Sequence, residues 1–174
     1  MTHHDTLLPD ELVEAARRVV EANRAAGLRV ATAESCTGGL VLGALTEIAG
    51  ASDVVEGGFV TYSSEAKVAL LKTSLDVLDT FGAVSVAVAW SMAQAALDRT
   101  GADVAVAITG VAGPDGGTAK KPVGTVVFAR AVKGANPAQI VADVRHFGDL
   151  GRGGVRLQAA LCALELLMPA APDA

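Results

Sequence analysis

A dense group of polar and small residues occupies the stretch Thr32-Ala33-Glu34-Ser35-Cys36-Thr37-Gly38-Gly39. The apolar run 28–33 predicts a buried strand, and apolar residues recur at helical spacing through 40–48. The stretch is therefore expected to connect a strand to a helix. Such a turn brings unpaired backbone N–H groups and the positive end of a helix dipole to one point.

A nucleophile at this turn would have donors for an oxyanion beside it. Ser35 is the candidate nucleophile, and the N–H groups around Cys36, Thr37 and Gly38 are the candidate donors. In the alternative interpretation, Ser35 or Thr37 only caps the helix, and the glycines only shape the turn. The stretch alone leaves both interpretations open.

A tyrosine and a lysine lie at and beyond the end of the next predicted strand, 54–63. If Ser64 caps the helix that comes after this strand, Lys67 lies in the first helical turn, where the helix dipole disfavours a cation. The same field would lower the pKa of the lysine and help it to act as a base. The alternatives are a solvated lysine on a helix face and a half-buried, structural Tyr62.

A glycine-rich loop, Gly110-Val111-Ala112-Gly113-Pro114-Asp115-Gly116-Gly117, follows a buried strand predicted at 103–109. The loop lacks the Gly-Lys-Ser/Thr of a P-loop and the spacing of a dinucleotide-binding fingerprint. Lys120 and Lys121 beside it are candidates to meet a phosphate, or they are simply solvated. The same two interpretations apply to a group of three arginines, Arg145, Arg152 and Arg156.

The composition favours an α/β protein and excludes several classes. The chain has 174 residues, of which 51% are hydrophobic, and a net charge of −5. Its basic residues are dispersed, so no broad nucleic-acid surface is expected, and no apolar run is long enough to span a membrane. The two cysteines predict no disulfide framework and favour a cytoplasmic protein. Since His3 and His4 lie in a polar tail and only His146 remains, the sequence predicts no metal site.

Hydrophobic periodicity predicts a three-layer α/β/α sandwich with a mixed, mostly parallel sheet. Two successive strands joined by the hairpin 133–137 break the alternation and add an antiparallel component. Residues 1–174 are interpreted as one domain, with loose tails at 1–8 and 169–174. The predicted helices are 9–26, 40–48, a short helix from Ser63 or Ser64, 75–81, 85–100 and 152–168, and the predicted strands are 28–33, 54–63, 103–109, 123–132 and 139–147.

Four sequence blocks together resemble the CinA C-terminal domain family, whose characterised activity is deamidation of nicotinamide mononucleotide. The blocks occur in the order of the family and span nearly the whole chain. We expect the stand-alone deamidase form, without the N-terminal domain of the longer family members. The blocks are Ala33 to Gly39, Phe59-Val60-Thr61-Tyr62-Ser63 with Glu65-Ala66-Lys67, Gly110 to Gly117, and Lys121-Pro122-Val123-Gly124-Thr125-Val126.

The resemblance implies a serine amidase that uses no metal or cofactor and converts nicotinamide mononucleotide to nicotinate mononucleotide. Ser35 would be the nucleophile, and Lys67 and Tyr62 would be its proton-handling partners. The residues expected to bind substrate are Glu34, Gly39, Thr109, Gly110, Gly113, Lys121 and Arg152.

One segment departs from the family pattern. Residues 148–156 are looser and richer in glycine than the compact Gly-Asp-Arg that usually precedes the last helix of the family. Because of this departure, the family pattern does not by itself assign a ligand-binding role to Asp149 or Arg152. It does not affect the set of Ser35, Tyr62 and Lys67.

Two other interpretations stand beside the amidase. One is a catalytically silent CinA-like domain that binds a nucleotide or a protein partner. The other is a thiol hydrolase with Cys36 as nucleophile, which lacks a histidine near it in the sequence. For the amidase we expect a homodimer that binds a small-molecule nucleotide, with neither nucleic acid nor membrane as a partner.

Overall fold

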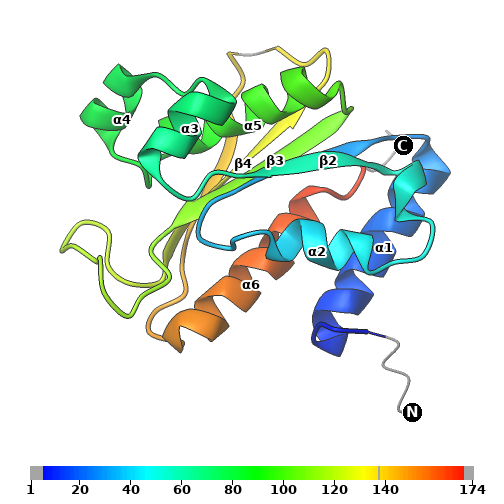
Figure 1. The fold of residues 1–174 in the computed structure, drawn as a ribbon, viewed down its shortest axis with the longest axis horizontal. Coiled ribbons are helices and arrows are strands. Elements are labelled where there is room, and N and C mark those ends of the chain that lie inside the picture. Colours follow the sequence, from blue (N-terminus) through cyan, green and yellow to red (C-terminus); the bar gives the residue numbers. More distant parts are fainter. Residues whose placement is uncertain (1–5, 137, 171–174) are drawn as a thin grey trace.

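The computed structural model describes residues 6–136 and 138–170 of the chain (Figure 1). The helices are α1 (Asp10–Ala26), α2 (Leu40–Thr46), α3 (Ser64–Leu71), α4 (Leu75–Phe81), α5 (Val86–Thr100) and α6 (Gly151–Leu166), with a 3₁₀ turn, η1, at Ala51–Asp53. The strands are β1 (Val30–Glu34), β2 (Val55–Val60), β3 (Val104–Gly110), β4 (Thr125–Val132) and β5 (Val141–His146). As predicted, β4 and β5 follow each other without a helix between them.

The described strands form one mixed sheet in the order β2-β1-β3-β4-β5. β1 pairs in parallel with β2 and with β3, whereas β4 is antiparallel to both β3 and β5. Because two antiparallel steps restore the direction, β5 runs the same way as β1, β2 and β3. The prediction of a mixed, mostly parallel sheet is confirmed.

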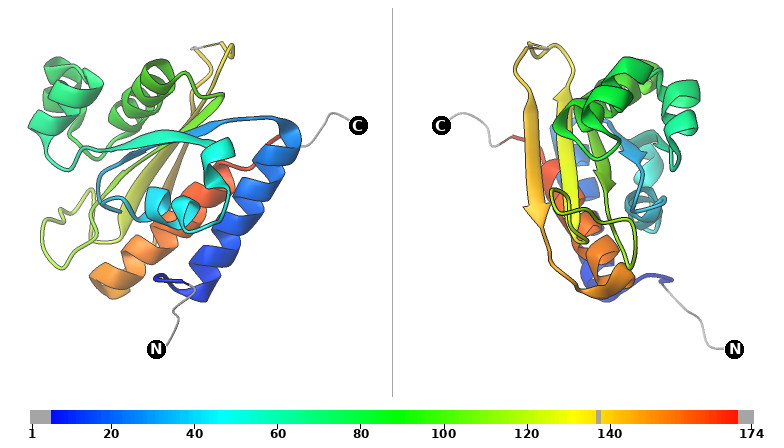
Figure 2. Two further views of the ribbon diagram at one scale, coloured as in Figure 1. Left: turned by 45° about the vertical axis from the view of Figure 1, so that its right-hand side comes forward. Right: turned by 90° about the vertical axis from the view of Figure 1, so that its left-hand side faces the viewer.

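Helices cover both faces of this sheet, which gives the predicted three-layer sandwich (Figure 1). α1, α2 and α6 pack on one face, around Leu12, Leu45 and Leu164, and α1 and α6 lie side by side (Figure 2). α3, α4 and α5 pack on the other face, around Leu71 and Met92. Burial of each such side chain contributes about 1.5–3 kcal/mol to folding. The two layers hold β1, β2 and β3 so that their carboxyl ends meet at one edge.

Local signals define several helix ends. Gly27 ends α1 in the left-handed region with φ of 67°, a conformation that favours glycine. Ser85 caps α5, as predicted. At α3 the cap is Ser63, whose hydroxyl accepts a hydrogen bond from the N–H three residues later. Of the two caps that the sequence offers, the structure thus has Ser63 and not Ser64, so Lys67 lies one position further into α3 than a Ser64 cap would place it.

Predicted and observed boundaries mostly differ by one or two residues. β4 begins at Thr125 rather than at 123, because Gly124 takes φ of 89° and forms a turn. β1 begins at Val30 rather than at 28, because the N–H of Leu28 still bonds the carbonyl of Asn23 at the end of α1. These boundaries depend on backbone conformations that hydrophobic periodicity does not report.

The predicted amino-terminal tail is anchored at its inner end. The N–H of Leu7 donates to the Glu47 carboxylate at 2.6 Å, and Leu8 packs against the core. Residues 7 and 8 of the expected loose tail 1–8 thus contact the rest of the chain. Positions 1–5, with His3 and His4, position 137 of the hairpin and positions 171–174 of the other expected tail lie outside the described residues.

Within the described ranges, every helix is too short or too polar to cross a membrane.

Candidate active site

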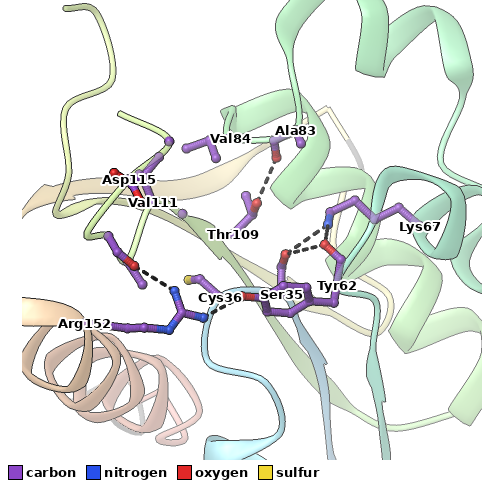
Figure 3. A pocket seen from close by; sticks show the side chains of 14 residues that line it. Ser35, Cys36, Tyr62, Lys67, Ala83, Val84, Thr109, Val111, Asp115 and Arg152 are labelled. Carbon is purple, nitrogen blue, oxygen red and sulfur yellow. Dashed lines mark hydrogen bonds between the residues drawn. The ribbon is translucent and has the colours of Figure 1, made fainter. Parts of the chain in front are cut away.

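A cavity of about 310 Å³ opens at the edge of the sheet where β1 and β3 end (Figure 3). Ligand sites in α/β sheets commonly lie at the carboxyl ends of the strands. The three polar clusters expected from the sequence, at 34–37, 62–67 and 109–121, each contribute to this cavity. Its lining residues are Ser35, Cys36, Tyr62, Lys67, Ala83, Val84, Thr109, Gly110, Val111, Ala112, Gly113, Asp115, Gly116 and Arg152.

The side chains of Ser35 and Lys67 meet in this cavity (Figure 3). Ser35 directly follows β1, and its N–H donates to the carbonyl of Ile108 on β3 at 2.9 Å. Lys67 comes from α3, and its Nζ lies 3.0 Å from Ser35 Oγ. Ser35 is 7% exposed and Lys67 is 1% exposed. The hydroxyl and the amine are therefore in direct contact and largely shielded from bulk water.

Two backbone carbonyls complete the surroundings of the Lys67 amine. Nζ donates to the carbonyl of Thr61 at 2.8 Å and to that of Tyr62 at 3.4 Å, just beyond β2. A neutral amine has two N–H donors and one lone pair, so it can bond both carbonyls and accept the hydroxyl proton of Ser35. Across the described ranges, no carboxylate lies within ion-pair distance of Lys67.

Burial lowers the pKa of Lys67 below its ordinary value. Removal of the amine from water penalises its charged form. The position of Lys67 near the start of a helix predicts the same direction of the pKa shift from the helix dipole, but burial is its main cause. A lysine that loses its proton readily beside a serine hydroxyl is suited to act as a general base.

The hydroxyl of Tyr62 points away from the contact between Ser35 and Lys67. It accepts a hydrogen bond from Arg152 Nη2 at 2.6 Å, and the Tyr62 side chain is exposed. The backbone carbonyl of the same residue, by contrast, lies 3.5 Å from Ser35 Oγ. The sequence leaves open whether Lys67 acts on Ser35 directly or through Tyr62, and this geometry favours the direct route.

The Glu34 carboxylate is fully buried and bonds the start of α2 rather than lining the cavity. Oε2 accepts from the N–H groups of Gly39 at 3.0 Å and Val41 at 3.2 Å, and Oε1 accepts from Leu42 at 2.9 Å. These three N–H groups at the start of α2 are thus already bonded and are not available to a ligand. Glu34 and Gly39, both expected to bind substrate, are not among the residues that line the cavity, and they organise the helix behind the turn.

One of the three expected oxyanion donors, the N–H of Gly38, is used within the turn itself. The N–H of Gly38 donates to the carbonyl of Ser35 at 3.0 Å, which removes Gly38 from the set. The N–H groups of Cys36 and Thr37 lie beside the Cys36 thiol. The carbonyl of Thr37 accepts from Arg156 Nη2 at 2.8 Å, so an arginine of α6 holds the turn in place.

Cys36 lines the cavity as a protonated thiol. Burial raises its pKa to about 11, and the charge of Glu34 acts in the same direction. Because the thiolate is the nucleophilic form of cysteine, this environment disfavours nucleophilic attack by Cys36 at neutral pH. No histidine lines the cavity among the described residues. The geometry therefore favours Ser35 as the nucleophile.

Arg152, near the start of α6, joins two walls of the cavity (Figure 3). Its Nη1 donates to the carbonyl of Gly113 at 2.8 Å, and its Nη2 donates to the Tyr62 hydroxyl. The looser segment 148–156 thus still brings Arg152 to the site. Asp149 is not among the lining residues; its carboxylate bonds the N–H of Gly151.

Thr109 and Gly110, at the end of β3, form part of the cavity wall as expected. The Thr109 hydroxyl donates to the carbonyl of Ala83 at 2.8 Å and so joins β3 to the loop before α5. A Cβ on Gly110 would lie 2.8 Å from the backbone of β4, which explains the need for glycine there. Sequence reasoning missed Ala83 and Val84, which are apolar loop residues without a motif.

Lys121 lies outside the cavity that contains Ser35. Its Nζ donates to the carbonyl of Phe81 at 2.8 Å, at the end of α4. Together with Lys120 it lines a separate pocket of about 230 Å³ beside β5. Of the two basic residues expected to bind substrate, Arg152 therefore lines the cavity and Lys121 does not.

The potential metal ligands are dispersed. Across residues 6–136 and 138–170, no three side chains of His, Cys, Asp or Glu come together in a metal-binding arrangement. His146 Nδ1 lies 3.2 Å from the Thr125 hydroxyl, and Cys36 and Cys162 are both free cysteines. The described residues therefore provide no donor set for a metal.

Comparison with known proteins extends these observations. A family model described as the CinA C-terminal domain matches residues 12–171. A protein of Enterobacter agglomerans named nicotinamide-nucleotide amidohydrolase PncC is 50% identical over 142 residues, covering 82% of this chain and 84% of that protein. A CinA-like protein of Mycobacterium sp. (strain JLS) is 51% identical over 148 residues, which cover 85% of this chain. The match spans only 34% of that longer relative, as it does for several others.

Solved structures share the fold over most of the chain. The competence/damage inducible protein CihA from Agrobacterium tumefaciens superimposes with a TM-score of 0.88 at 49% identity, covering 93% of this chain and 96% of that one. A competence-damaged protein (CinA) superfamily protein from Escherichia coli gives a TM-score of 0.83 at 37% identity, with 94% of each chain covered. The architecture described above is thus that of these crystal structures.

Proposed function

The chain belongs to the CinA C-terminal domain family, and we propose that it hydrolyses nicotinamide mononucleotide to nicotinate mononucleotide and ammonia. The relative named nicotinamide-nucleotide amidohydrolase supports this reaction, because the match extends over most of both chains. The observation that carries the proposal is the buried contact of 3.0 Å between Ser35 Oγ and Lys67 Nζ. This contact supports the proposal because a hydroxyl beside a neutral amine is a combination that can cleave an amide.

In the proposed first step, the neutral Lys67 amine takes the hydroxyl proton of Ser35 while Oγ bonds to the carboxamide carbon. The amide oxygen becomes an oxyanion, and the N–H groups of Cys36 and Thr37 are the proposed donors to it. The Lys67 ammonium that forms is held by the two backbone carbonyls that follow β2. It returns its proton to the amide nitrogen, the C–N bond breaks, and ammonia leaves.

Water resolves the acyl-enzyme in the proposed second step. Lys67 takes a proton from the water as its oxygen bonds to the ester carbon. The bond from this carbon to Ser35 Oγ then breaks, and Oγ receives the proton back from Lys67. The product is a carboxylic acid, which loses its proton to water and leaves as the carboxylate, and the proposed sequence uses no metal or cofactor.

Two features of the mononucleotide suit it as the substrate. Its pyridinium ring withdraws electrons, so the carboxamide carbon is more electrophilic. Its phosphate is a remote anchor whose binding energy can orient the reacting amide. Because the net charge of the chain is −5, the anchor must be a local cation. Arg152 is the proposed anchor. To bind the phosphate, its guanidinium would give up its hydrogen bonds to the carbonyl of Gly113 and to the Tyr62 hydroxyl.

We propose the cytoplasm as the setting of this reaction. Cys36 and Cys162 are both free, as expected in a reducing compartment. The proposed ligand is a small nucleotide, and neither a nucleic acid nor a membrane is part of the proposal.

Ammonia release from nicotinamide mononucleotide by the purified protein is the direct test. Ser35→Ala should abolish the release at a cost of about 1 kcal/mol in folding stability, the net value of one hydrogen bond. Cys36→Ala is the matched control and should retain most of the activity. A folded Ser35→Ala variant with near wild-type turnover, or a dead Cys36→Ala variant, would contradict the assignment.

A comparison of substrates tests the rest of the proposal. The value of kcat/KM should fall from the mononucleotide to its dephosphorylated riboside, and fall further to free nicotinamide. Equal values for mononucleotide and riboside would remove the phosphate anchor. A folded wild-type protein that binds the mononucleotide without releasing ammonia would instead be the silent CinA-like domain.

A further inference from the structure

We infer that β5 is the contact surface for a second copy of this chain, paired edge to edge about a two-fold axis at Val144. β5 is the last strand of the sheet, and the right-hand view of Figure 2 shows it in orange at the margin, with no described helix or strand beyond it. No residue of β5 lines the cavity that contains Ser35. The inference is therefore independent of the proposed reaction.

The hydrogen-bond pattern shows which backbone groups of β5 face outward. The N–H of Phe147 donates to the carbonyl of Gly124 at 2.9 Å, and the register between β4 and β5 continues without a shift from there. In an antiparallel pair, every second residue bonds the partner strand, so the odd-numbered residues of β5 bond β4. The N–H and C=O groups of Ala142, Val144 and His146 consequently point to the open edge.

The charges on β5 select one register for a self-pairing. An axis at Val144 sets Val144 beside its copy and places Asp143 of each strand opposite Arg145 of the other. Opposite charges across two strands stabilise the pair, and like charges destabilise it. An axis at Asp143 or at Arg145 would place that residue opposite its own copy. In the single chain the two side chains already form an ion pair along the strand.

Exposed apolar side chains favour the same contact. Ile140, Val141 and Val144 are 51%, 50% and 42% exposed. An axis at Val144 would bring two copies of that side chain together and cover part of this surface. The other open edge, β2, carries Glu56 and no basic residue, so it offers no such complementarity.

Charges on an edge strand more often prevent association. Natural proteins place lysines and other charged residues on exposed edges so that a second chain is repelled. On β5 the two charges are of opposite sign and face each other across one specific axis. The same residues that would repel an unrelated strand therefore favour a second copy of this one.

Sedimentation of the full chain over a range of concentrations tests the inference. The wild type should form a dimer. Asp143→Arg places an arginine opposite Arg145 of the other copy, and Arg145→Asp places an aspartate opposite Asp143 of the other copy. Because like charges then face each other, each substitution should raise the dissociation constant by about tenfold or more. Glu21→Arg makes the same change of charge as Asp143→Arg at an exposed position of α1, and should leave the dissociation constant unchanged.

Mixing the two single variants tests the register itself. In a mixed pair both arginines of one copy face both aspartates of the other, so a heterodimer should form with nearly wild-type affinity. The double variant Asp143→Arg/Arg145→Asp should dimerise as well. A wild type that stays monomeric, a dimer that the single variants leave intact, or single variants that do not recover on mixing would each overturn the inference. Ammonia release, measured in parallel, reports separately on the proposed reaction.

Discussion

The Glu34→Gln substitution removes one acceptor oxygen from the buried carboxylate that joins β1 to α2. In the wild type, the carboxylate accepts from the N–H groups of Gly39, Val41 and Leu42 at 3.0, 3.2 and 2.9 Å. A glutamine keeps one oxygen and turns an NH₂ group toward these donors. One or two bonds are lost, each worth about 1.5–3 kcal/mol when one partner is charged. The free energy of unfolding should therefore fall by about 3 kcal/mol.

Urea unfolding followed by far-ultraviolet circular dichroism measures this loss. It is a large part of the roughly 5–15 kcal/mol that stabilises a typical protein. For a chain of this size it should lower the Tm by roughly 6–12 °C. Glu21→Gln, on the exposed face of α1, is the matched control and should change little. Ammonia release per folded molecule should also fall, because Ser35 is the next residue.

Two results would refute this reasoning. A destabilisation well below about 1 kcal/mol would show that other groups hold the start of α2. A large destabilisation with unchanged turnover in the folded fraction would show that Glu34 supports the fold without positioning Ser35.

Three further outcomes are expected. Lys67→Met should abolish turnover. Burial lowers the pKa of Lys67 in the folded chain, so the unfolded chain binds more protons at any pH between the lowered pKa and about 10.4. The free energy of unfolding of the wild type should therefore rise with pH relative to that of the variant, by at most about 1.4 kcal/mol per pH unit. If urea titrations give the same pH dependence of stability for both proteins, this reasoning is contradicted. Arg152→Ala should raise KM for nicotinamide mononucleotide more than it lowers kcat, and an unchanged KM would exclude the anchor. Turnover should survive thorough chelation, and loss reversed by a divalent metal would contradict the serine mechanism.

The layers and most element ends follow from local signals in the sequence. Gly27 and Ser85 mark helix ends because a left-handed residue and a hydroxyl cap act within one turn of the helix. The contact between Ser35 and Lys67 has no local signal, because the residues are 32 positions apart and meet through the pairing of β1 with β2. Only the resemblance to a family predicts that these two residues act together.

Side-chain directions at the site could not be predicted. The Tyr62 hydroxyl bonds Arg152, 90 positions away, and Lys121 bonds a carbonyl of α4, 40 positions away. The Glu34 side chain turns behind the strand because it accepts hydrogen bonds from three backbone N–H groups at the start of α2. These groups lie together only once α2 has formed, so the sequence alone does not predict the direction of the side chain. The almost complete burial of Lys67 also runs against the strong preference of lysine for the surface.

The pair of Ser35 and Lys67 joins opposite layers of the sandwich. The turn that contains Ser35 leads into α2, which packs with α1 and α6 on one face of the sheet (Figure 1). Lys67 comes from α3, which packs with α5 on the opposite face. The two side chains meet only after both layers have docked. During refolding, turnover should therefore return with the slower of the two docking events and later than helical content. A fragment that lacks one layer would be inactive, however well the other layer folded.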